Sequence, residues 1–65
     1  PVTELLREAK EKNDPMAISD ALFLVFELAQ RTGDPRLEEV LFLIWRALKE
    51  KDPRLLDRAI ELFER

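Results

Sequence analysis

Three Asp-Pro pairs divide this chain into segments and constrain its fold more than any other feature. They occur at Asp14-Pro15, Asp34-Pro35 and Asp52-Pro53. Proline disfavours helical geometry in the residue before it, so each pair ends the preceding helix. Proline also suits the first position of a new helix, where the aspartate before it accepts a backbone hydrogen bond as N-cap. Each pair therefore predicts the end of one helix and the start of the next.

The three pairs predict four helices joined by turns too short to hold any other element. Gly33 lies where the C-terminus of a helix favours a left-handed residue. No segment shows the apolar–polar alternation of a half-buried strand. We expect one all-α domain over the 65 residues, a compact four-helix bundle with helices near 2–12, 15–31, 35–51 and 53–64. An up-down bundle and two stacked helical hairpins both fit this pattern.

The composition argues against several functional classes. Cys and His are both absent, which excludes disulfides and a Cys/His zinc site. A net charge of −3 disfavours binding to the phosphates of nucleic acid. No apolar stretch approaches the roughly 20 residues of a membrane span, and we see no targeting signal from which to infer a location. We expect no cofactor, no membrane or nucleic-acid partner and no small-molecule substrate.

The segment "RTGDPRLEEV", the Asp-Pro helix starts and the density of Leu, Glu, Arg and Lys give the chain an idealised character. In these features the whole chain resembles a computationally designed helical miniprotein. The resemblance implies a stable scaffold, a self-assembling subunit or a binder of a chosen target, and it identifies no site residue. High helix propensity, caps and dense aliphatic residues also predict high thermal stability.

Two apolar runs exceed what one helix face needs in a small bundle. Residues 21–29 read "ALFLVFELA" and residues 40–48 read "VLFLIWRAL". At about 100° per residue, each of the two middle helices has a core stripe and an opposite polar arc. The predicted core stripes are Ile18, Ala21, Leu22, Val25, Leu28 and Ala29 in one helix, and Leu37, Val40, Leu41, Ile44, Ala47 and Leu48 in the other.

Phe23 and Phe42 fall within the polar arcs, so we expect them to be exposed at least in part. The shoulder residues between stripe and arc are expected in the core or at its edge; they are Leu24, Phe26, Leu43 and Trp45. Exposed aromatic clusters are typical of protein interfaces. The predicted partner-binding surface comprises Met16, Phe23, Phe26, Phe42 and Trp45, with Asp20, Glu27, Arg46 and Lys49 as its polar rim.

Catalytic motifs are missing from the sequence. Ser19 lies in a polar arc with no base identifiable near it, and Glu38-Glu39 is better explained as a partner of the helix dipole. We therefore expect a protein without enzymatic activity. Three functions remain: a module that binds a target protein, a subunit that assembles with itself, and a scaffold without ligand in which every aromatic side chain is internal.

Overall fold

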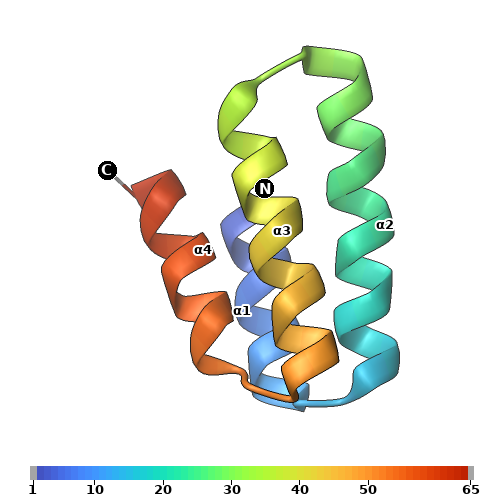
Figure 1. Ribbon diagram of the computed structural model, residues 1–65, viewed down its shortest axis with the longest axis vertical. Helices are drawn as coiled ribbons and strands as arrows, with labels where there is room; N and C mark the ends of the chain where they lie inside the picture. Colours follow the sequence, from blue (N-terminus) through green and yellow to red (C-terminus); the bar gives the residue numbers. More distant parts are fainter. Residues whose placement is uncertain (1, 65) are drawn as a thin grey trace.

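The computed structural model describes residues 2–64, which form four helices (Figure 1). Pro1 and Arg65 lie outside the described residues. The helices are α1 (Val2–Lys12), α2 (Pro15–Thr32), α3 (Pro35–Glu50) and α4 (Arg54–Glu64), and no strand occurs between residues 2 and 64. The all-α prediction is confirmed, and the helix ends agree with the expected ones to within a residue.

The four helices form an up-down bundle. In Figure 1, α1 runs down behind the others, α2 runs up on the right, α3 runs down in front and α4 runs up on the left. α1 contacts α2 and α4, and α3 also contacts α2 and α4, whereas the diagonal pairs do not approach each other in the described chain. Each helix therefore has two neighbours, and of the two arrangements left open by the sequence the up-down bundle is the observed one.

All three turns use the same short device. A residue with positive φ follows each of the first three helices: Asn13 (46°), Gly33 (68°) and Lys51 (56°). The aspartate that follows accepts a hydrogen bond from the backbone N–H two residues later, at 3.2 Å for Asp14, 2.9 Å for Asp34 and 3.1 Å for Asp52. Proline then fixes φ at the first residue of α2 and α3, and in the turn just before α4. These local signals explain why the helix boundaries follow from the sequence.

The core is entirely apolar among the described residues. Its buried members are Leu6, Ala9, Ile18, Ala21, Val25, Leu37, Val40, Ile44, Ala47, Leu55, Leu56, Ala59 and Ile60. Most of them belong to the predicted core stripes. In α4, Ile60 is buried, while Leu62 and Phe63 are only half-buried. These two residues lie in the last turn of α4, where fewer neighbouring side chains surround them.

Candidate functional site

Four aromatic side chains are exposed along α2 and α3. The exposed fractions are 66% for Phe23, 48% for Phe26, 57% for Phe42 and 45% for Trp45. The outward position of Phe23 and Phe42 is thus confirmed. The expectation that the shoulder residues lie in the core or at its edge is wrong for Phe26, Trp45 and Leu24, which is 50% exposed, and only Leu43 is partly buried.

The bundle geometry explains this outcome. A helix with two neighbours buries only the arc that faces the bundle axis and those two neighbours. Leu22 and Leu41 are partly buried and lie together where α2 and α3 meet. Phe26 and Trp45 lie just outside that seam and remain half exposed. The extra apolar width of the two middle helices is therefore presented to solvent.

These side chains surround one open groove between α2 and α3. Its volume is about 420 Å³, and its lining is wholly apolar in residue type: Leu22, Phe23, Phe26, Leu41, Phe42 and Trp45. Within it the Phe42 and Trp45 rings stack with their centroids 6.1 Å apart and an interplanar angle of 28°. We call Phe23, Phe26, Phe42 and Trp45 the aromatic face. Leu22 and Leu41, which we expected in the core, are partly buried and form the floor of this groove.

Met16 belongs to the same predicted surface but does not line the groove. It is 73% exposed in the first turn of α2. Seven residues separate it from Phe23, which is about 10 Å along a helix. The structure thus brings the four aromatic residues together and leaves Met16 as a separate apolar contact near the start of α2.

The rim on α3 is basic, and its two cations lie over aromatic rings. The Arg46 guanidinium is 5.9 Å from the Phe42 ring centroid, and the Lys49 ammonium is 4.8 Å from that of Trp45. Arg46 also donates a 2.9 Å hydrogen bond to Glu50, which raises the pKa of Arg46 above its ordinary value. Lys49 has no ion-pair partner within residues 2–64. The face therefore carries one guanidinium already neutralised by a neighbour and one unpaired ammonium.

The rim on α2 is acidic. Asp20 and Glu27 are exposed, and neither forms an ion pair in the described part of the chain. At about 100° per residue both lie at the outer edge of α2, farther from α3 than Phe23 and Phe26. The predicted rim residues thus lie on both sides of the groove, with acids along α2 and bases along α3.

The opposite side of the bundle has different chemistry. Ion pairs Arg7–Glu64 and Lys10–Asp57 join α1 to α4. No ion pair joins α2 to α3 among residues 2–64. The pair of helices on one side is thus connected by charges, and the pair on the other side presents aromatic rings.

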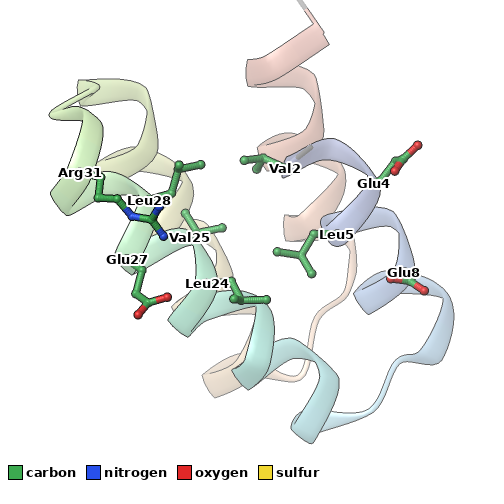
Figure 2. A pocket seen from close by; sticks show the side chains of 9 residues that line it. All are labelled: Val2, Glu4, Leu5, Glu8, Leu24, Val25, Glu27, Leu28 and Arg31. Atoms are coloured by element: carbon green, nitrogen blue, oxygen red, sulfur yellow. The ribbon is translucent and has the colours of Figure 1, made fainter.

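A second depression of about 550 Å³ lies between α1 and α2. Figure 2 shows Val2 and Leu5 of α1 pointing toward Val25 and Leu28 of α2, whereas Glu4 and Glu8, its other α1 residues, point away from the apolar walls. It forms because α2 has 18 residues and α1 only 11, so the upper part of α2 extends beyond its neighbour. Glu27 and Arg31 of α2 also line this depression.

Two acidic residues with a shifted pKa, Asp34 and Asp52, lie at helix starts. Hydrogen bonds from Arg36 hold the pKa of Asp34 below its ordinary value, and Arg54 does the same for Asp52.

Within residues 2–64 no cluster of acidic side chains is suited to a metal ion. In that range, too, every helix is too short or too polar to cross a membrane. No known protein family, curated protein or solved structure matches the chain, so a functional proposal depends on its residues and geometry.

Proposed function

We propose that this chain is a protein-binding module that docks a target protein through the aromatic face. The observation that carries the proposal is the exposure of four aromatic residues around one apolar groove. With about 200–250 Å² for each fully exposed aromatic residue, they present about 450 Å² to solvent. The largest apolar patch of a typical monomer covers about 300–600 Å² and is often functional. This is about a tenth of the 4586 Å² surface of the chain.

The groove fits a protein better than a small molecule. Small-molecule sites combine concave apolar walls with a few polar groups that orient the ligand, and this lining has no such side chain. Protein interfaces instead place aromatic anchors at the centre and charged residues at the rim. The rim of Asp20, Glu27, Arg46 and Lys49 has this arrangement. Cation–π contacts from Arg46 and Lys49 orient the Phe42 and Trp45 rings before binding.

A differential capture experiment tests the proposal. The chain and its Phe23→Asp/Phe42→Asp variant are immobilised in parallel, together with a Lys10→Ala control on the α1–α4 side. A captured protein counts only if the control retains it and the double variant does not. The captured protein is then purified and titrated against the chain. We expect a saturable blue shift of the fluorescence of Trp45, which is the only tryptophan of the chain. Equal capture by the double variant would contradict the proposal.

Two other functions remain for comparison. A scaffold in which every aromatic side chain is internal disagrees with the four exposed residues. A subunit that assembles with itself would use the same aromatic face, and the spacing of its residues favours this second candidate.

A further inference from the structure

Two stripes with identical spacing run along the side of α2 and α3 that carries the aromatic face. On α2 the stripe is Ser19, Phe23, Phe26 and Gln30, and on α3 it is Glu38, Phe42, Trp45 and Lys49. Steps of four, three and four residues keep each set on one side of its helix. Each stripe reads polar, aromatic, aromatic, polar in both directions. In charge, the two directions of the α3 stripe differ, because Glu38 lies at one end and Lys49 at the other.

The centres of the two stripes lie at nearly the same height in the bundle. α2 and α3 are antiparallel and joined by the turn at Gly33 and Asp34. The α2 stripe is centred about nine residues before this turn and the α3 stripe about ten residues after it, a difference of about 1.5 Å along a helix. The groove confirms this match, because the aromatic residues of both stripes line it together. One two-fold axis across the helices can therefore pass through both centres.

We propose that the aromatic face pairs with the same face of a second copy of this chain in an antiparallel two-fold dimer. The proposal rests on the docking function above and names a partner for that surface. In this arrangement each stripe lies over its own copy in reverse, so Phe42 faces Trp45 and Phe23 faces Phe26 of the other molecule. A two-fold interface of this kind forms every such contact twice.

The charges at the ends of the α3 stripe agree with this pairing. Reversal places Lys49 of one copy against Glu38 of the other, and both residues lack an ion-pair partner within residues 2–64 of the monomer. The ends of the α2 stripe are the neutral Ser19 and Gln30. At the outer edge of α2 the reversal brings the acidic Asp20 and Glu27 of the two copies near each other, which opposes the pairing at that edge. The interface thus contains two equivalent ion pairs that the isolated chain leaves unmade.

The available area is sufficient for a modest dimer. The aromatic residues contribute about 450 Å² per copy, so about 900 Å² per dimer, and the polar ends and groove floor extend this toward the smaller specific interfaces of about 1,200 Å². Interfaces of that size are often transient. We therefore expect a dimer whose dissociation constant lies in the micromolar range.

Sedimentation equilibrium from about 1 µM to about 500 µM tests the inference. The expected mass rises with concentration from the monomer value of 7.7 kDa toward twice that value. Lys49→Glu should weaken the dimer by about tenfold, because it reverses two ion pairs per dimer. Lys49→Glu combined with Glu38→Lys should restore the original affinity, since the pairs are then re-formed with exchanged signs.

Lys12→Glu is the matched control, because it changes the net charge equally at an exposed residue of α1. It should leave the dimer unchanged, and circular dichroism should show all variants folded. A constant monomer mass at every concentration would overturn the inference while leaving the docking of another protein untouched. A dimer that responds equally to Lys12→Glu and Lys49→Glu would also overturn it. Failure of the docking function would appear separately, as equal capture by the Phe23→Asp/Phe42→Asp variant.

Discussion

Replacing both exposed phenylalanines with aspartate should leave the fold intact. Phe23 and Phe42 are 66% and 57% exposed. For residues of about 200 Å², the fold then hides about 70 and 85 Å², part of which is helix backbone that aspartate also hides. About 100 Å² of side-chain area remains, which at about 25 cal/mol per Å² gives an upper estimate of about 2.5 kcal/mol for the double change. A chain of this length has a free energy of unfolding of about 3–10 kcal/mol.

A single core change supplies the contrast. Ile44 is fully buried in α3, two residues from Phe42 and therefore on the opposite side of the helix. Removing a buried side chain of this size costs about 2–5 kcal/mol, and an unpaired buried carboxylate adds several more. We therefore expect Ile44→Asp to unfold the chain, whereas Phe23→Asp/Phe42→Asp stays folded with a reduced midpoint.

Denaturant titration followed by far-ultraviolet circular dichroism measures both variants. We expect the double variant to unfold in a cooperative transition. Its free energy of unfolding should be lower than that of the unchanged chain by no more than about 2.5 kcal/mol. If the double variant instead lost more than about 5 kcal/mol or had no folded baseline, both rings would contribute to the core. The aromatic face would then not exist as a docking surface.

Three further predictions concern the turns. Hydrogen bonds from Arg36 and Arg54 hold the pKa values of Asp34 and Asp52 below their values in the unfolded chain. The charged carboxylates therefore stabilise the fold above about pH 4. This stabilisation is lost as the pH falls through the lower pKa of the folded state. Acid titration of stability should be shallower for the Asp34→Asn/Asp52→Asn variant, which keeps side chains able to cap; an unchanged acid limb would contradict this. Gly33→Ala should cost about 1 kcal/mol in thermal melting, because φ is 68° and nothing lies within 4 Å of an added Cβ. Lys51→Gly, at a φ of 56°, should stabilise the chain instead, and a loss of stability there would refute the strain assigned to that turn.

The helices could be predicted from the sequence because their boundary signals are local. Each Asp-Pro pair ends one helix and begins another through contacts within a few residues, as the Asp14 and Asp34 caps show. The start of α4 differs by one residue, since the turn formed by Asp52 and Pro53 includes the proline and the helix begins at Arg54. The core stripes also followed, because an apolar face must turn toward the bundle axis.

The exposure of the shoulder residues could not be predicted in the same way. Whether Leu24, Phe26 and Trp45 are covered depends on how many helices surround α2 and α3 and where those helices end. The periodicity of one helix predicts neither the number of its neighbours nor the positions at which they end. Phe23 and Phe42 were assigned correctly because they lie within polar arcs, which point outward in any bundle. The groove floor at Leu22 and Leu41 depends on the α2–α3 seam, and only the assembled structure shows it.

The central claim is that the fold leaves the aromatic face uncovered. The most direct test measures how strongly a paramagnetic molecule in the solvent enhances the relaxation of the aromatic ring protons. The Lys49→Glu variant at low concentration keeps the chain monomeric for this measurement. We expect strong relaxation enhancement at the Phe23 and Phe42 rings and almost none at the methyl groups of Val25 and Ile44, which are buried. Phenylalanine rings as protected as those core methyl groups would show that the monomer encloses them and would contradict the account.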